Sequence, residues 1–147
     1  MDFNSLSTDY YQPYSWQSRD FEPTASLGFV SPYAGAEVRE DFVEVIANYI
    51  VKTDERWENI LDIASKGWAL EMDIFGNPIR DENGKRVYKE VIDSDGVDGK
   101  TLILQKLWIC KQWMRESWNV DLDKLREEVQ TRQKNMDIHL LRNQLKQ

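Results

Sequence analysis

Three acidic residues within one short stretch are the strongest chemical feature of this sequence. Glu40, Asp41 and Glu44 lie in the segment REDFVEV, and a spacing of four places Glu40 and Glu44 on the same side of a helix. Like charges at this spacing destabilise a helix by about 0.2–0.5 kcal/mol, which suggests a functional reason for the pair. Glu40 could ligate a metal ion, while Glu44, one turn further on, orients the other ligands. Tyr33, on the segment that enters the helix, could donate its phenol O–H to a developing oxyanion.

A second interpretation of the same carboxylates needs no metal. Negative side chains in the first turn of a helix are favoured by the positive end of the helix dipole. This explains Glu37, Glu40 and Asp41 well, but it explains Glu44 poorly because Glu44 lies beyond the first turn. From the residues alone, both interpretations remain open.

The helix that would position these carboxylates is predicted from about Glu37 to Val51. Apolar residues recur there at the spacing i, i+3, i+4, i+7 that is typical of one buried helix face. We expect Asp41 to point away from the side that carries Glu40 and Glu44. The residues of the apolar face are Val38, Phe42, Val45, Ile46, Tyr49 and Ile50.

The next two elements are a helix and a β-hairpin. Thr53 is a plausible N-cap for a helix whose body runs from Arg56 to Ala64 and which ends near Gly67. Asn83-Gly84 lies between segments of high strand propensity and is a strong hairpin signal. We therefore predict strands near 74–80 and 85–91.

Two further helices are predicted in the C-terminal third. The first spans about 100–119 and has a broad apolar face, so we expect it to be central to the core. The second starts near Leu122 after a cap at Asp121 or Asp123. Its predicted inward residues are Leu125, Val129 and Met136, and its predicted outward residues are Arg126, Glu127, Glu128 and Arg132. The last residues, 134–147, fit either a docked helix or a frayed tail.

Two separated motifs carry a family resemblance. Tyr33 leads by seven residues into E-D-F-V-E at 40–44, and S-W-N-V-D-L-D-K-L-R-E-E-V-Q follows at 117–130. In this order they resemble the gluzincin-like zinc-binding metallopeptidases that include the substrate-import-associated zinc metallohydrolase lipoproteins of Bacteroidetes. The resemblance implies that Glu40 is a zinc ligand and that Tyr33 is catalytic and hydrogen-bonds the oxyanion. It also implies that Glu44 and Asp41 support the metal ligands from outside the coordination sphere.

The family's main zinc motif is absent from this sequence. In the resembled family, zinc is held by two histidines of H-E-x-x-H together with the glutamate that matches Glu40. This chain has no H-E-x-x-H, and its only histidine and cysteine are His139 and Cys110. A catalytic zinc usually needs three protein ligands, so we do not expect this chain alone to bind zinc or to work as an enzyme. We expect His139 to be an exposed polar residue and Cys110 to be a small buried one.

Length and composition predict one globular domain. The chain has 147 residues, of which 41% are hydrophobic and 12% aromatic, and six tryptophans suggest a well-packed core. The predicted fold is mainly α, namely the C-terminal helical part of a gluzincin-like metallopeptidase domain with one inserted β-hairpin. The expected parts of this single partial catalytic domain are an aromatic-rich loop (1–26), the glutamate helix with the following helix (27–66), the hairpin insertion (70–92) and the C-terminal helices (100–147).

Charge and hydropathy limit the partners. A net charge of −7 and a pI near 4.8 argue against nucleic acid, because phosphate binding needs clustered Lys and Arg. No apolar run is long enough for a transmembrane helix, and the start of the chain lacks the features of a signal peptide. For the intact parent, the resemblance implies a peptide or protein substrate and a place in the cell envelope, as an outer-membrane lipoprotein or in the periplasm. It implies as partners the missing N-terminal part or glycan-import proteins.

The alternative function is a non-catalytic helical module. In that case the acidic helix and the aromatic N-terminal loop would bind a protein or a glycan, and no histidine ligands would be needed. The resemblance favours the C-terminal part of a zinc-dependent metallohydrolase, and both functions are retained as hypotheses.

Overall fold

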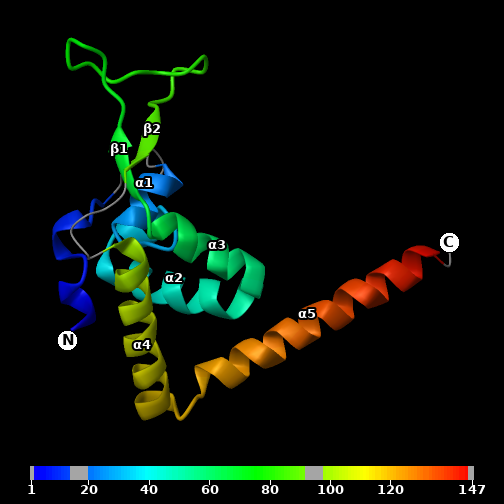
Figure 1. Ribbon diagram of the computed structural model, residues 1–147. Coiled ribbons are helices and arrows are strands. Elements are labelled where there is room, and N and C mark those ends of the chain that lie inside the picture. The colour runs from blue at the N-terminus through cyan, green and yellow to red at the C-terminus, as the bar shows by residue number, and fades with distance from the viewer. Residues whose placement is uncertain (1, 14–19, 92–97, 146–147) are drawn as a thin grey trace.

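The computed structural model describes residues 2–13, 20–91 and 98–145, apart from the side chains at 4, 138 and 139. Within these residues the protein is mainly helical with a two-stranded antiparallel sheet, which confirms the predicted fold class. Figure 1 shows a helical body with two projections, an arm beyond the sheet and the long last helix. The elements are η1 (Phe3–Ser5), η2 (Thr8–Tyr10), α1 (Phe21–Ser26), η4 (Tyr33–Gly35), α2 (Val38–Val51), α3 (Asp54–Ala64), β1 (Gly67–Leu70), β2 (Tyr88–Val91), α4 (Gly99–Trp118) and α5 (Leu122–Leu145).

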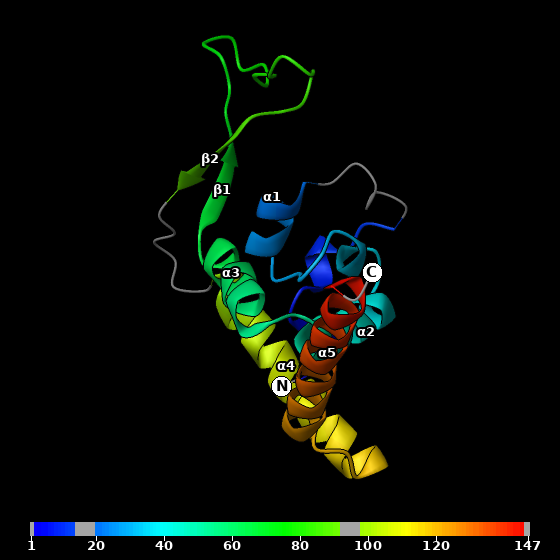
Figure 2. The same ribbon diagram turned by 90° about the vertical axis from the view of Figure 1, so that its right-hand side faces the viewer.

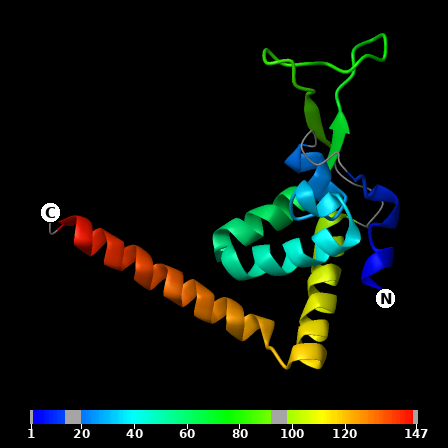
Figure 3. The same cartoon turned by 180° about the vertical axis from the view of Figure 1, so that it is seen from behind.

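The predicted helices of the body are confirmed. Thr53 caps α3 by accepting a hydrogen bond from the backbone N–H of Arg56 at 3.3 Å. Asp98 caps α4 in the same way through Thr101 N–H, at 2.8 Å. Both α2 and α3 pack on α4, so α4 is central as expected. The two termini lie on opposite sides of the body, as Figure 3 shows from behind.

The core lies between α2, α3 and α4 and is closed by α1 and the N-terminal segment. Its fully buried side chains include Phe29, Val45, Ile103 and Cys110. Cys110 is the small buried residue predicted from the sequence, and burial raises the pKa of its thiol to about 12.

Gly99 is required where α4 begins. A Cβ atom added there would lie 2.7 Å from the carbonyl oxygen of Ala64 and still closer to that of Ala25. The start of α4 therefore packs against backbone at the ends of α1 and α3, which only a residue without a side chain permits.

The second predicted strand, 85–91, contains the observed β2, but the first, 74–80, is misplaced. β1 is Gly67–Leu70, earlier than expected, and it pairs with β2, Tyr88–Val91, in the register Gly67↔Val91. The segment between them forms an exposed arm with two tight turns, visible above the sheet in Figures 1 and 2. In each turn an aspartate accepts two backbone N–H bonds, Asp73 at the first and Asp81 at the second. The Asn83-Gly84 turn exists, but it supports only the isolated bridge Arg80↔Arg86.

The N-terminal segment is more regular than predicted. It contains η1, η2 and the short helix α1 in place of an irregular loop. Phe3 is buried and Tyr11 is half-buried, so part of its aromatic content belongs to the core. Two further aromatic residues of the predicted 1–26 loop, Tyr14 and Trp16, lie outside the described residues.

The last helix differs from the prediction in two side chains. Arg126 was expected to face outward but is only 8% exposed, and Met136 was expected inward but is 64% exposed. The open question about residues 134–145 is answered by a helix whose leucines are exposed, among them Leu141 and Leu145. His139 lies in α5, but its side chain is outside the described part, so its predicted exposure stays a prediction.

The tryptophans do not all contribute to the core. Trp57 is buried, whereas Trp108 and Trp118 expose 62% and 67% of their surface. None of the described helices is long and apolar enough to span a membrane.

Candidate functional site

Tyr33 and Glu40 are brought together by the turn that enters α2. Tyr33 opens η4, directly before α2, and its hydroxyl donates a hydrogen bond to the Glu40 carboxylate. This bond is the main reason why the pKa of Tyr33 is raised above its ordinary value. The neutral phenol is therefore favoured, and it keeps a proton that it can donate at this surface.

Glu44 is held in one orientation by two neighbours. Its Oε2 atom accepts a hydrogen bond from the Ser31 hydroxyl at 3.0 Å and another from the Asn48 side-chain amide at 3.0 Å. The Ser31 oxygen in turn accepts the backbone N–H of Ala34 at 3.1 Å. A carboxylate fixed in this way is suited to orient a neighbouring group.

Asp41 points into the core, away from the other two carboxylates. It is fully buried, and its Oδ2 atom accepts from Lys106 Nζ at 2.8 Å and from the Tyr11 hydroxyl at 2.7 Å. Lys106 is also fully buried and donates to the carbonyl oxygen of Gly28 at 2.7 Å. Among the described residues no donor reaches Asp41 Oδ1.

Burial dominates the electrostatics of this pair. It raises the pKa of Asp41, and the attraction of Lys106 opposes that shift only in part. Burial likewise lowers the pKa of Lys106, against the attraction of Asp41. The short contact and the Tyr11 hydrogen bond nevertheless favour the ionised pair.

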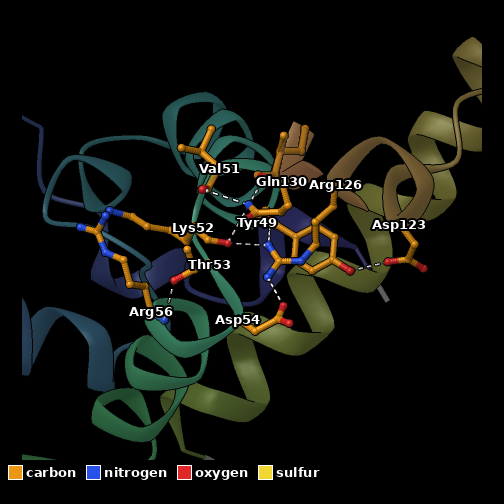
Figure 4. Close-up of polar contacts among 10 residues, drawn as sticks. Tyr49, Val51, Lys52, Thr53, Asp54, Arg56, Asp123, Arg126 and Gln130 are labelled. Carbon is orange, nitrogen blue, oxygen red and sulfur yellow. Dashed lines mark hydrogen bonds and ion pairs between the residues drawn. The ribbon is translucent and has the colours of Figure 1, made fainter. Parts of the chain in front are cut away.

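Sequence reasoning missed the role of Arg126, which holds the C-terminal end of α2 (Figure 4). One nitrogen of its guanidinium donates to the carbonyl oxygens of Tyr49 and Lys52, the latter at 2.8 Å. The other nitrogen pairs with Asp54 at 2.7 Å. Carbonyls at the end of a helix lack partners within the helix, so Arg126 satisfies them.

Gln130, one turn further along α5, completes the contact. Its side-chain amide donates to the carbonyl oxygens of Ile50, Val51 and Lys52 at 2.8, 3.0 and 3.1 Å. Figure 4 shows Arg126 and Gln130 side by side over the end of α2. We call these two residues the α2 clasp.

The start of α5 is fixed by aspartates. Asp121 accepts the backbone N–H groups of Asp123 and Lys124 at 3.0 and 3.2 Å, which caps the helix. Asp123 accepts a hydrogen bond from the Tyr49 hydroxyl and pairs with Lys111 at 3.0 Å. The hydrogen bond from Tyr49 is the main cause of the lowered pKa of Asp123. These residues belong to the D-L-D-x-L-R-x-x-V-Q motif noted in the sequence. In the structure the motif caps the start of α5 and binds the C-terminal end of α2.

Two hollows lie next to α2. A cleft of about 820 Å³ is lined by Ser31 and Asn48, the two residues that hold Glu44, and by charged residues of α3. A groove of about 800 Å³ between α2 and α4 is almost wholly apolar and includes Phe42, Ile46 and Trp113.

The described residues do not make a zinc site by themselves. In the part of the chain that the structure describes, no group of three or more His, Cys, Asp and Glu side chains could hold a metal ion. Glu40 supplies one carboxylate ligand, and the two other protein ligands of a catalytic zinc site are lacking among these residues.

The comparisons with known proteins agree with these motifs. A family model described as "Putative zinc-binding metallo-peptidase" matches residues 1–123. The crystal structure of a protein from Bacteroides caccae ATCC 43185, described in the same words, has a TM-score of 0.66 and 32% sequence identity. The match covers 90% of this chain but only 39% of that one. No curated protein sequence matches. The chain therefore belongs to the family described as putative zinc-binding metallo-peptidases.

Proposed function

We propose that this chain is the C-terminal part of a zinc-dependent metallohydrolase that acts on peptide bonds and that it is inactive alone. The observation that carries the proposal is the grouping of Tyr33, at the start of η4, with the half-buried Glu40 and Glu44 in the first half of α2. Because the described residues lack a complete ligand set, the remaining ligands come from outside this chain, from an H-E-x-x-H helix in the longer protein.

Each of these three residues has a defined part in this proposal. Glu40 is the carboxylate ligand, and Glu44, held by Ser31 and Asn48, orients the side chains around it. Tyr33 donates its proton to the oxygen on which negative charge develops. Bound zinc would supply Lewis acidity and an activated water.

The exposed face of α2 supports completion by another helix. Val43 and Val51 expose 57% and 51% of their surface and lie on the same side of the helix as Glu40 and Glu44. Apolar side chains beside carboxylates are suited to packing against a helix that brings further ligands.

The place of action is proposed from the resemblance. We assign the intact protein to the bacterial cell envelope, as an outer-membrane lipoprotein or in the periplasm, together with glycan-import proteins. Its substrate would be a peptide or protein. The alternative is a helical module that binds a protein or glycan, which the exposed aromatic rings of Trp108 and Trp118 favour.

Substitution of Glu40 tests the proposal. In a protein that joins this chain to the part bearing H-E-x-x-H, Glu40→Gln removes a charged ligand, so zinc content by elemental analysis and peptidase activity should fall together. Glu44→Gln should weaken zinc binding by about 10–100-fold. Glu116→Gln, on the exposed surface of α4, is the control and should change neither value. Unchanged zinc content and activity in Glu40→Gln would reject the metallohydrolase in favour of the binding module.

A further inference from the structure

The rotation of α2 about its axis does not follow its apolar face. Successive residues are about 100° apart around a helix, so the six apolar residues are centred near Phe42. The two side chains of α2 that are fully buried are instead Asp41 and Val45. Their midpoint lies about 80° round the helix from the centre of the apolar face. As a result Phe42 and Ile46 are only half-buried, and Val43 is 57% exposed.

The interaction that coincides with this rotation is the Asp41–Lys106 pair. Both side chains are 0% exposed, and their charged atoms are 2.8 Å apart. Tyr11 from the N-terminal segment donates to Asp41, and Lys106 donates to the carbonyl oxygen of Gly28 in the loop after α1. Lys106 Nζ also lies 4.3 Å from the centre of the Phe29 ring. Asp41 is thus held from two separate segments of the chain, the N-terminal segment through Tyr11 and α4 through Lys106.

A buried ion pair of this kind fixes the orientation of a helix more effectively than it stabilises the fold. Removing two charges from water costs about as much as their attraction returns, and replacing buried pairs by apolar residues is often neutral or stabilising. Yet an ionised Asp41 turned outward would leave Lys106 buried without its partner, which is strongly unfavourable. The pair therefore selects one rotation of α2 among those that apolar packing allows.

The selected rotation decides where the functional carboxylates lie. In the observed position Glu44 reaches Ser31 at 3.0 Å, and Glu40 receives the hydrogen bond of Tyr33. Turning α2 so that Phe42 became central to the core would carry Glu40 and Glu44 round the helix by the same angle. Both contacts with the Ser31–Gly35 segment would then be broken.

We propose that Asp41 and Lys106 are positioning residues, which set the rotation of α2 and thereby place Glu40 and Glu44 beside Ser31 and Tyr33. The inference rests on the proposed function for the importance of the two glutamates. Its geometry is independent of zinc and can be tested on this chain alone.

The test removes both charges and measures contacts by nuclear Overhauser effects in solution. The double variant Asp41→Leu/Lys106→Met keeps side chains of similar volume and should remain folded. We expect the effects between Ser31 and Glu44 and between Tyr33 and Glu40 protons, present in the unaltered chain, to fall to the noise level. Helix content by circular dichroism should stay unchanged.

Cys110→Ala is the matched control. It removes volume from the same part of the core, one turn from Lys106, but keeps the ion pair, so both contacts should persist. Asp41→Ala/Lys106→Met serves as a second variant in case the first overfills the site.

Retention of both contacts in a folded double variant would overturn the proposal, because apolar packing alone would then set the rotation. Unfolding of both double variants would also overturn it, since the pair would then be needed for stability. Neither outcome would alter the zinc test of Glu40→Gln, so failure of this inference is distinguishable from failure of the proposed function.

Discussion

Single residues far from the carboxylates determine how α2 is held. Arg126 is the clearest case, because its guanidinium replaces water at the last carbonyls of the helix and is mostly shielded from solvent. Its partner Asp54 is 96% exposed, so that ion pair contributes little. Arg126 therefore stabilises the fold mainly through its hydrogen bonds to the carbonyl oxygens at the end of α2.

Replacing Arg126 should destabilise the fold markedly. Arg126→Met leaves partly buried carbonyls at the end of α2 without a charged donor, and we expect the free energy of unfolding in urea to fall by about 2–3 kcal/mol. Arg132→Met, also in α5, breaks only an exposed pair with Glu128 and should cost about 0.5 kcal/mol or less. Equal losses of unfolding free energy in the two variants would contradict a stabilising role for the α2 clasp.

At the scale of elements, the body and the arm are stabilised differently. α4 starts at Gly99 against the backbone of α1 and α3, so this junction is part of the core. The arm between β1 and β2 is exposed along its length, and its turns depend on local aspartate and glycine geometry. Substitutions in the arm should therefore disturb only the arm and leave the stability of the body nearly unchanged.

Two glycine substitutions compare the junction with the arm. Gly99→Ala places a methyl group against backbone oxygens, which should cost at least about 2 kcal/mol and lower Tm by about 4–8 °C. Gly76→Ala, at a φ of +82° with open space around it, should strain only the first turn of the arm. Its Tm in calorimetry should stay within about 2 °C of the unaltered chain. A larger loss from Gly76→Ala than from Gly99→Ala would show that the arm belongs to the cooperative core.

The whole molecule corresponds to part of a longer protein of known structure. It spans 39% of the Bacteroides caccae structure that it resembles. Its carboxylate face, its apolar groove and the end of α5 all expose groups suited to further packing. The metallohydrolase proposal accounts for the carboxylate face, since the other ligands would be placed against it.

The purified chain should not retain zinc. After incubation with zinc and dialysis, we expect elemental analysis to find much less than one equivalent, because a stable site usually needs three protein ligands. Stoichiometric zinc would contradict this and would mean that His139 or a second copy of the chain completes a site. The chain dialysed without added zinc is the control.

The sequence by itself determined the helices of the body and the family. The α2, α3 and α4 segments were predictable because apolar periodicity and, for α3, the cap Thr53 are local properties. The grouping of Tyr33 with Glu40 was predictable for the same reason, since a short turn joins them.

Only the tertiary structure decided which charged residues enter the core. Asp41 and Arg126 appear solvent-facing in a local pattern, and their burial depends on Lys106 and on the carbonyls of α2, which are distant in the chain. Strand β1 was missed because its pairing with β2 spans the whole arm. The rotation of α2 was likewise undetermined, because an ion pair between distant segments outweighs the apolar periodicity that the sequence displays.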